Sequence, residues 1–405
     1  MYAFEILMTN ETCFNFFISN KRNRVQKDDL LWEKSVPGSR CPSHTDLQTD
    51  SPEHVTYGKY FNAARSFLKK ERFKTIVFAA SQYCKTEIKP ENIKQIDIFL
   101  EKHGAFYHPS RIEIDINCQQ VRFVLNVATS RPGKSCIKKE YKTLQRLNHN
   151  FSKVFFPVVY EFGEVNDKDN NDSIPMFLGE WLEGYNEFHI SKDVNCNKNR
   201  ICVWSPENGN FFLSNQEETE LYSQASMILT YYFNLETFEQ IFPWHHAAGD
   251  FVVSKNNGKI KTKLITARQY ASMIQNTGDC KNNINFDPDF ILEALLLFFL
   301  NLSIRMRIDR MDGTGNIVWS EKTAVKGMVK GFNKALILKS FPGNPATRVD
   351  VCFKDYILSF SQEKIFSLIQ EIVNTYNPLS KDVDLIRQNL EEHVETLYSK
   401  ISKAD

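Results

Sequence analysis

The residues best suited to do chemistry lie in one short stretch, "PWHHAAGD", in which His245 and His246 precede Asp250. A histidine side chain can act as a base near neutral pH, and its neutral ring can also bind zinc. A carboxylate such as that of Asp250 offers the hard oxygen ligands that Mg²⁺ prefers. The stretch is therefore compatible with a zinc site at His245 and His246, or with a reaction centre that uses His245 and Asp250.

The rest of the sequence limits which kinds of site this stretch could form. A zinc site would need a third ligand from elsewhere, because no expected helix carries two histidines four residues apart. A serine hydrolase is disfavoured, because the chain contains no GxSxG motif. The elements that precede and follow the stretch must therefore decide how it is interpreted.

Composition limits the classes of partner. The chain has 405 residues and a net charge of +1, which argues against nucleic acid or an anionic membrane as the dominant partner. The nine cysteines form no CxxC pair, which favours reduced thiols and a cytoplasmic location. The most apolar run, 291–306, contains Glu293 and is short for a membrane span. We therefore expect a buried helix there and no membrane span.

The first half of the chain alternates between helical and strand-like patterns. Apolar residues recur on one helical face within 57–71 and again within 135–149. Alternating or β-branched apolar runs predict strands separated by short turns. These strands fall within residues 93–104, 110–116, 120–129, 154–165 and 173–184.

The second half is mainly helical. Helices are expected at 216–242, 288–309, 320–338, 360–375 and 380–402. One β-hairpin interrupts them at 250–270, where "NNG" is a strong turn signal between two apolar runs. A strand-rich part followed by a helical part predicts an α+β fold.

This order of elements, with the motifs "FLGEWLEGY" and "GDFVVSKNNGKIKTKLIT", resembles the protein-kinase-like superfamily, and especially its aminoglycoside and choline phosphotransferase branch. The resemblance covers residues 95–340. It implies a bilobal fold with a small antiparallel-sheet N-lobe and a larger helical C-lobe. The expected domains are an N-terminal extension, 1–94, an N-lobe with a hinge, 95–184, and a C-lobe with C-terminal helices, 185–405.

The resemblance also implies nucleotide-binding positions. In that family a lysine on the third strand holds the phosphates, and a glutamate on the next helix fixes this lysine. Here Asn126 stands at the lysine position and Glu140 at the glutamate position, although Glu140 could instead be a solvated helix residue. Gly104 could let backbone amides approach phosphates, or belong to an ordinary turn. The backbone between Glu180 and Leu182 would hydrogen-bond an adenine ring.

The family's catalytic loop has an aspartate, an asparagine five residues later, and then a hairpin that leads to a metal-binding aspartate. If 250–270 is that hairpin, His245 stands for the catalytic aspartate, Asp250 for the asparagine and Thr266 for the metal-binding aspartate. Asp250 would then be the remaining metal ligand, and Arg268 could replace a missing cation by contacting an anion. A second register makes Asp250 the catalytic aspartate, with Asn256 or Asn257 downstream, and leaves the hairpin too short.

These substitutions predict a pseudokinase or a nucleotide-binding scaffold, because Asn126 and Thr266 are neutral where the family has charged groups. The alternative is an atypical phosphotransferase or nucleotidyl transferase that acts on a small molecule or a protein through His245 and Asp250. The implied cofactor is ATP or another nucleotide, with Mg²⁺ or Mn²⁺. A second dense motif, 305–319, is either an ion-pair network or a contact for a substrate or partner.

Overall fold

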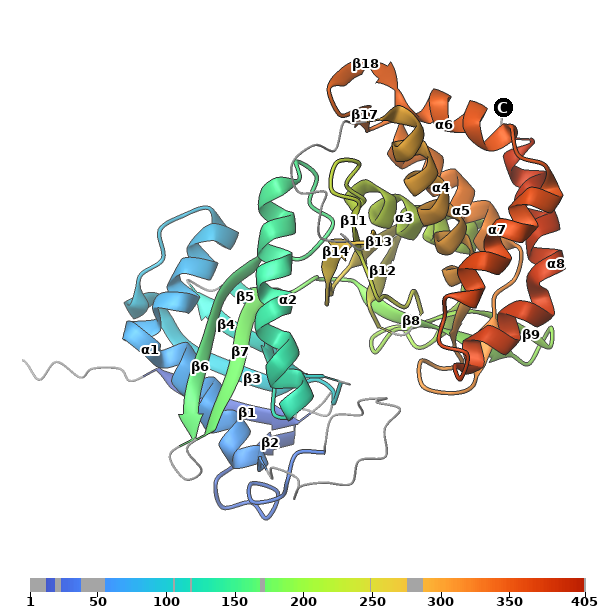
Figure 1. The fold of residues 1–405 in the computed structure, drawn as a ribbon. Helices are drawn as coiled ribbons and strands as arrows, with labels where there is room; N and C mark the ends of the chain where they lie inside the picture. Colours follow the sequence, from blue (N-terminus) through green and yellow to red (C-terminus); the bar gives the residue numbers. More distant parts are fainter. Residues whose placement is uncertain are drawn as a thin grey trace, which may run out of the picture. The chain divides into compact units, whose positions relative to one another are not determined.

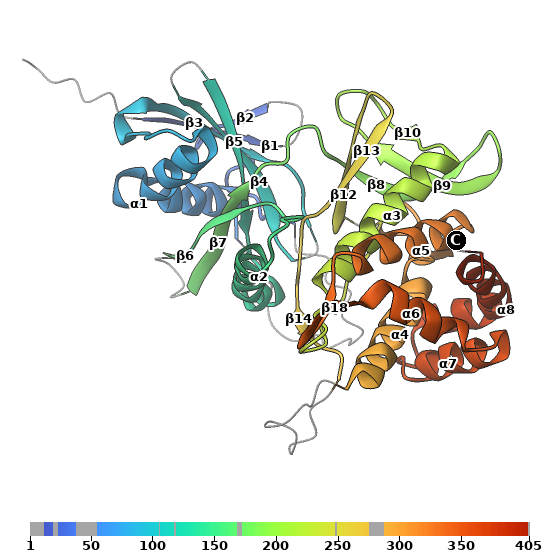
Figure 2. The same ribbon diagram turned by 90° about the horizontal axis from the view of Figure 1, so that it is seen from above.

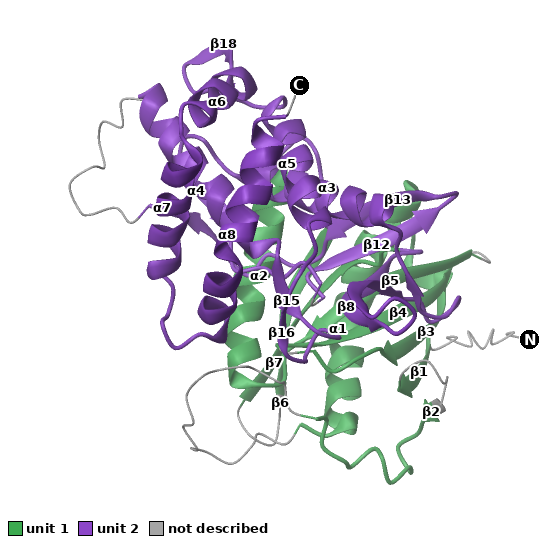
Figure 3. Cartoon of the chain, turned by 90° about the vertical axis from the view of Figure 1, so that its right-hand side faces the viewer, with its two compact units in different colours: residues 1–149, 157–182 green, residues 150–156, 183–405 purple. Residues whose placement is uncertain are grey.

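The computed structural model describes residues 12–18, 23–37, 55–104, 106–116, 119–167, 172–247, 249–274 and 287–403. Figures 1 and 2 show the chain from two directions. The chain divides into two compact units, which Figure 3 colours separately. Unit 1 comprises residues 1–149 and 157–182, and unit 2 comprises residues 150–156 and 183–405.

A mixed β-sheet is the framework of unit 1 (Figure 1). Within the described residues its order is β2-β1-β3-β4-β5-β7-β6. The strands span Cys13–Ile18 (β1), Asn23–Val25 (β2), Ile93–Leu100 (β3), His108–Ile116 (β4), Gln119–Val127 (β5), Val159–Asp167 (β6) and Asp172–Glu180 (β7). β1 runs parallel to β3, and the other neighbours are antiparallel. The strands that the sequence predicts in this half are confirmed as β3 to β7.

The described part of unit 1 also contains two α-helices, α1 at Tyr57–Cys84 and α2 at Arg131–Asn150. Phe61 and Leu68 of α1 are buried in the same apolar cluster as Ile98 of the sheet. The first strand, β1, also pairs with β3. The segment that contains β1 and α1 is therefore part of the body of unit 1, in contrast to the separate extension expected up to residue 94.

Unit 2 is mainly helical. Its helices are α3 (Asn215–Tyr232), α4 (Pro288–Arg305), α5 (Thr323–Leu336), α6 (Val349–Leu358), α7 (Gln362–Asn374) and α8 (Lys381–Ile401). A sheet in the order β10-β9-β8-β12-β13 consists of Asn186–Asp193 (β8), Lys198–Trp204 (β9), Phe211–Phe212 (β10), Phe251–Asn256 (β12) and Lys259–Leu264 (β13). Smaller pairs are Glu239–Ile241 (β11) with Tyr270–Ser272 (β14), Ile308–Arg310 (β15) with Ile317–Trp319 (β16), and Ser340–Phe341 (β17) with Asn344–Arg348 (β18).

Helices α3 and α5 lie side by side (Figures 1 and 2) and approach very closely because α5 carries glycine where they meet. A Cβ atom at Gly327 would lie 2.5 Å from the carbonyl oxygen of Thr219. A Cβ atom at Gly331 would lie 1.9 Å from the carbonyl oxygen of Ser223. Only the absence of a side chain permits this contact, so the two helix backbones touch directly.

The helix expected at 216–242 is wrong in its second half, because α3 stops at Tyr232. The side chain of Asn234 accepts hydrogen bonds from the backbone N–H of Glu236 at 2.7 Å and of Thr237 at 3.1 Å. A turn of this kind competes with continued helix. After this turn the chain forms strand β11, which is followed by the histidine-containing stretch.

The helix expected at 288–309 also ends early, because α4 stops at Arg305. The residues that follow form strand β15, in which Ile308 pairs with Trp319 of β16. Residues 308 and 309, which the helical periodicity includes in the predicted helix, therefore belong to the two-stranded ribbon β15–β16. The buried helix predicted for the apolar run is confirmed as α4, and the helices predicted at 320–338, 360–375 and 380–402 are confirmed as α5, α7 and α8.

The α+β fold class predicted from the sequence is confirmed. Among the described residues, unit 2 combines its helices with a five-stranded sheet and two-stranded ribbons, whereas the larger sheet belongs to unit 1. None of the described helices has both the length and the apolar character that crossing a membrane requires.

Candidate functional site

The loop 242–250 joins β11 to β12, and backbone hydrogen bonds fix both its ends to the segment that follows β13. The Phe242 N–H donates to the carbonyl oxygen of Gln269 at 3.2 Å. The Ile265 N–H donates to the carbonyl oxygen of Asp250 at 2.8 Å. Strand β11 also pairs with β14. The loop and the segment after the hairpin therefore form one local site within unit 2.

Asp250 is the centre of this site, and its side chain is only 2% exposed. Arg268 contacts both carboxylate oxygens, with Nη1 2.8 Å from Oδ2 and Nη2 against Oδ1. The backbone N–H of His245 donates to Oδ2 at 2.8 Å. A buried charge is tolerated when it is paired and hydrogen-bonded in this way. The Asp250 carboxylate is therefore fully engaged by groups of the chain itself.

These contacts set the ionisation of the site. Burial alone would raise the pKa of Asp250, but Arg268 and His245 outweigh it and hold that pKa below its ordinary value. The Asp250 carboxylate raises the pKa of the His245 ring, against the lowering effect of burial. The ring is 49% exposed, with Nδ1 3.7 Å from Oδ2 of Asp250. The site thus presents an accessible imidazole beside a sealed ion pair.

His246 differs sharply from its neighbour, because its side chain is completely buried. Its Nδ1 lies 3.3 Å from Oδ2 of Asp309, and its Nε2 shares a hydrogen bond of 3.3 Å with the hydroxyl of Tyr222. Tyr222 in turn donates to the hydroxyl of Ser320 at 3.2 Å. Burial lowers the pKa of His246 despite the nearby carboxylate. The buried His246 ring therefore anchors the loop 242–250 to Tyr222 in the interior of unit 2.

Ala247 is held by two side chains that no pattern in the sequence links to this loop. Its N–H donates to Oδ2 of Asp309 at 2.6 Å, and its carbonyl oxygen lies 2.8 Å from Nδ1 of His189. These partners come from β15 and β8, far away in sequence. Asp309 belongs to the charged motif 305–319 that stands out in the sequence, but nothing in that motif indicates Ala247 as its partner.

The magnesium site implied by the resemblance does not fit the residues present. Mg²⁺ requires several hard oxygen ligands, usually carboxylates and waters. Both oxygens of Asp250 are bound to Arg268, and Thr266 is neutral. The buried hydroxyl of Thr266 has no hydrogen-bond partner among the described residues. Arg268, expected to contact an anion, contacts the very carboxylate that would have held the metal.

The second register is incompatible with the geometry. It pairs Asp250 with Asn256 or Asn257, but Asn256 is the last residue of β12 and Asn257 lies in the turn after it. Asn256 follows Asp250 by six residue steps of extended strand, which corresponds to roughly 20 Å. The hairpin has its full length, because β12 and β13 pair from Phe251 to Leu264. The hairpin thus has the length that the first register assumes.

The zinc alternative receives no support from the arrangement of the two histidines. His245 faces outward beside Asp250, whereas His246 is enclosed between Asp309 and Tyr222. Within the described ranges, no group of three histidine, cysteine or carboxylate side chains is placed to hold a metal ion. Two rings with such different surroundings do not form the tetrahedral ligand set of a zinc site.

Several residues expected to bind a nucleotide lie in unit 1. Asn126 is in β5, between β4 and β7. Glu140 is 1% exposed and shares the buried face of α2 with Ile137 and Leu144. The solvated alternative for Glu140 is therefore wrong. Gly104 lies in the turn between β3 and β4, where its N–H donates a hydrogen bond of 3.1 Å to a backbone carbonyl.

The expected hinge residues, Glu180 and Leu182, lie at the end of unit 1. The N–H of Glu180 donates to the carbonyl oxygen of Val158 at 2.8 Å, and its Oε2 accepts the Val158 N–H at 3.1 Å. The Glu180 amide is therefore engaged within unit 1. In unit 2 the structure brings together three of the predicted site residues, His245, Asp250 and Arg268.

The charged motif 305–319 belongs to an internal network. Arg307 is 3% exposed, and its Nε donates to the carbonyl oxygen of Ser320 at 2.7 Å. Its guanidinium pairs with Glu392 at 3.1 Å and lies 4.7 Å from the ring centre of Trp319. Of the two alternatives for this motif, the structure supports the ion-pair network.

Comparison with known proteins adds little to this geometry. No protein-family model matches the sequence, and no curated protein matches it either. Among solved structures, a chain described as WaaP in complex with acyl carrier protein is similar to this chain at 9% sequence identity. The alignment covers 72% of this chain and 85% of that chain, with a TM-score of 0.25.

Proposed function

We propose that this protein is a kinase-like binding protein, a pseudokinase, that lacks metal-dependent phosphoryl transfer. The observation that carries the proposal is the ion pair between Asp250 and Arg268, whose Nη1 and Oδ2 atoms are 2.8 Å apart. Phosphoryl transfer in kinase-like enzymes depends on metal ions that neutralise the phosphates. In this chain a fixed arginine neutralises the carboxylate that would have bound such an ion.

Other features of the chain support the same proposal. Asn126 provides no positive charge for a triphosphate, and Thr266 provides no negative charge for a metal. The loop itself is firmly held, because Ala247 is bound from both sides by Asp309 and His189. A loop with satisfied internal contacts and without metal ligands is better suited to a scaffold than to phosphoryl transfer.

The ligand that we propose for the scaffold is a nucleotide bound without a metal ion. Support comes from the kinase-like order of elements and from Glu140, which is buried at the helix position expected from the resemblance. Without the usual lysine at the third strand, the purine and sugar would contribute more to affinity than the phosphates do. Adenosine should then bind nearly as well as ATP.

The test is thermal unfolding of the whole protein with ATP or adenosine, in EDTA or in MgCl₂, together with a measurement of ATP consumption. A ligand at 100 times its dissociation constant adds about 2.7 kcal/mol to the free energy of unfolding. We expect equal stabilisation with and without Mg²⁺, and no ATP consumption above that of the double variant His245→Gln/Asp250→Asn. Mg²⁺-dependent consumption that this variant abolishes would refute the proposal.

A metal-free transferase that uses His245 as a base is the second candidate. It is favoured by one observation, the half-exposed imidazole 3.7 Å from the Asp250 carboxylate. A base must be unprotonated, and Asp250 raises the pKa of this ring, so the activity would increase as the pH rises through that pKa. Transfer from ATP that persists in EDTA, shows this pH dependence and disappears in His245→Gln would establish this candidate.

A further inference from the structure

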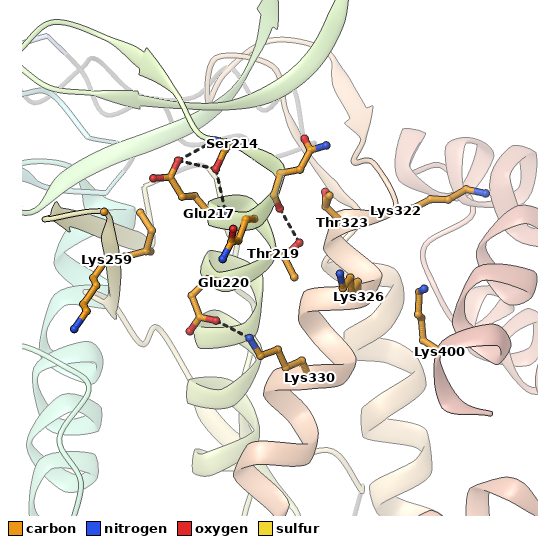
Figure 4. A pocket seen from close by; sticks show the side chains of 14 residues that line it. Ser214, Glu217, Thr219, Glu220, Lys259, Lys322, Thr323, Lys326, Lys330 and Lys400 are labelled. Carbon is orange, nitrogen blue, oxygen red and sulfur yellow. Dashed lines mark hydrogen bonds and ion pairs between the residues drawn. The ribbon is translucent and has the colours of Figure 1, made fainter. Parts of the chain in front are cut away.

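A broad open groove of about 1120 Å³ lies entirely within unit 2 and is separate from the loop 242–250. Its walls are the start of α3, the turn between β12 and β13, the exposed face of α5 and the end of α8. Figure 4 shows these walls, with lysines contributed by three of the four elements. Neither the resemblance nor the proposed nucleotide site accounts for this surface.

The groove is strongly basic although the whole chain is nearly neutral. Among the described residues that line it, the lysines are Lys259, Lys322, Lys326, Lys330 and Lys400, and the acidic residues are Glu217 and Glu220. The glutamates already have partners in the chain. Glu220 pairs with Lys330 at 2.9 Å, and Glu217 pairs with Lys255 at 2.7 Å. Within the described residues, Lys326 and Lys400 form no ion pair.

Three lysines line one face of α5. Lys322, Lys326 and Lys330 follow each other at intervals of four residues, so they lie on one helical face. Lys322 pairs with Glu392 at 3.3 Å and Lys330 with Glu220 at 2.9 Å, so Lys326 between them is the member without an ion pair within the described residues. The positive end of the helix dipole lies at the same place. The first turn of α5 contains no acidic residue, and no side chain caps it. A bound anion would complement both the charge of Lys326 and the uncapped start of the helix.

We propose that this groove binds a soluble small molecule that carries several phosphate groups. Lysine ammonium groups donate charge-assisted hydrogen bonds to phosphate oxygens without requiring one fixed geometry. The volume is comparable with the roughly 300–1,000 Å³ of typical small-molecule sites. An overall charge of +1 gives no long-range attraction to a polymer such as nucleic acid. The site uses residues of unit 2 alone and does not depend on the proposed pseudokinase function.

The test is calorimetric titration of the whole protein with tripolyphosphate, which has no purine and so does not report on the nucleotide site. The double variant Lys326→Gln/Lys400→Gln removes two groove charges. Lys354→Gln/Lys364→Gln removes two exposed charges from α6 and α7 and is the matched control. We expect the groove variant to bind roughly tenfold more weakly or worse, the order expected for lost charge-assisted hydrogen bonds, and the control to bind like the wild type.

A second measurement does not depend on the stability of the variants. Acetylation of lysines in the wild-type protein, mapped by mass spectrometry, should be slowed at Lys326 and Lys400 by tripolyphosphate and unchanged at Lys354. Absence of tripolyphosphate binding, equal affinity in both double variants, or absence of protection at Lys326 and Lys400 would overturn the proposal. Binding only to vesicles that carry phosphorylated inositol lipids would also overturn it, in favour of a membrane surface.

The same variants separate this proposal from the proposed function. If adenosine stabilises Lys326→Gln/Lys400→Gln as it does the wild type, nucleotide binding is independent of the groove. If tripolyphosphate binds the wild type whereas adenosine has no effect, the groove proposal stands and the nucleotide proposal fails. Competition between ATP and tripolyphosphate for one site, lost in the groove variant, would assign ATP to the groove.

Discussion

Oδ2 of Asp309 accepts the backbone N–H of Ala247 at 2.6 Å, across 62 positions of sequence. The same oxygen lies 3.3 Å from Nδ1 of His246, whose ring is fully buried. One carboxylate of the ribbon β15–β16 thus holds Ala247 by a hydrogen bond and lies against the ring of the residue before it. The conformation of the loop therefore depends on a strand that contributes nothing to its exposed surface.

Replacing this carboxylate should destabilise the protein. Asp309→Ala leaves the buried Ala247 N–H without its acceptor, and a buried unsatisfied group costs about 1–3 kcal/mol. Urea unfolding at neutral pH should show a loss of this size. Asp355→Ala, at an exposed position on α6, is the control and should change little. A similar loss in both variants would show that Asp309 does not have this special role.

Removing one partner of the Asp250–Arg268 pair should cost more than removing both. Arg268→Ala leaves a buried carboxylate uncompensated, and breaking a buried ion pair in this way costs about 3–5 kcal/mol. In the double variant Arg268→Ala/Asp250→Ala the unpaired charge is gone, so part of the stability should return. Urea denaturation of the two single variants and the double variant measures this coupling. Additive losses would mean that the two side chains do not stabilise each other.

Acid should destabilise unit 2 through His393. Burial, assisted by Arg307, lowers the pKa of this histidine to about 3, against about 6.5 in an unfolded chain. Between these values the unfolded state binds a proton that the folded state does not, so stability is complete above pH 6.5 and falls as the pH decreases. The free energy of unfolding of His393→Gln should depend less on pH between 7 and 5. His149→Gln, at an exposed position, should keep the wild-type dependence.

The close approach of α3 and α5 makes a clear prediction for Gly331. In an exposed helix, Gly→Ala would stabilise by up to about 1 kcal/mol. Here the new Cβ would lie 1.9 Å from the carbonyl oxygen of Ser223, so the helices must separate, at a cost of about 1–3 kcal/mol. Thermal unfolding shows whether Gly331→Ala raises or lowers the stability. Asn333→Ala, on the exposed side of α5, is the control. Stabilisation by both variants would contradict the described contact.

The hairpin was the most predictable part of the site, because its signals are local. Asn257 and Gly258 have positive φ angles of 49° and 73°, as a two-residue turn requires, and "NNG" announces this turn in the sequence. Once the hairpin is placed, Asp250 and Arg268 must lie at its two ends. The nearness of these two residues follows from strand pairing, although their ion pair could not be read from the sequence.

The supports of the loop could not be predicted, because they arise from tertiary contacts. Nothing local links Ala247 to Asp309 or to His189. The pairing of β1 with β3 likewise joins Cys13 to Gln95, which no nearby pattern indicates. The early end of α3 depends on the side chain of Asn234, whose turn competes with a helical periodicity that continues beyond it.

The glycine contacts between α3 and α5 have a consequence for how the chain can change. α3 ends at Tyr232 and α5 begins at Thr323, so residues 233–322 connect two helices that are in direct backbone contact. When the two ends of an excursion are fixed, doubling its length costs only about 0.6 kcal/mol of closure entropy. Lengthening the turns within this segment should therefore cost little closure entropy, whereas β12, which pairs with β8, and α4, which packs against α5, belong to the core of unit 2.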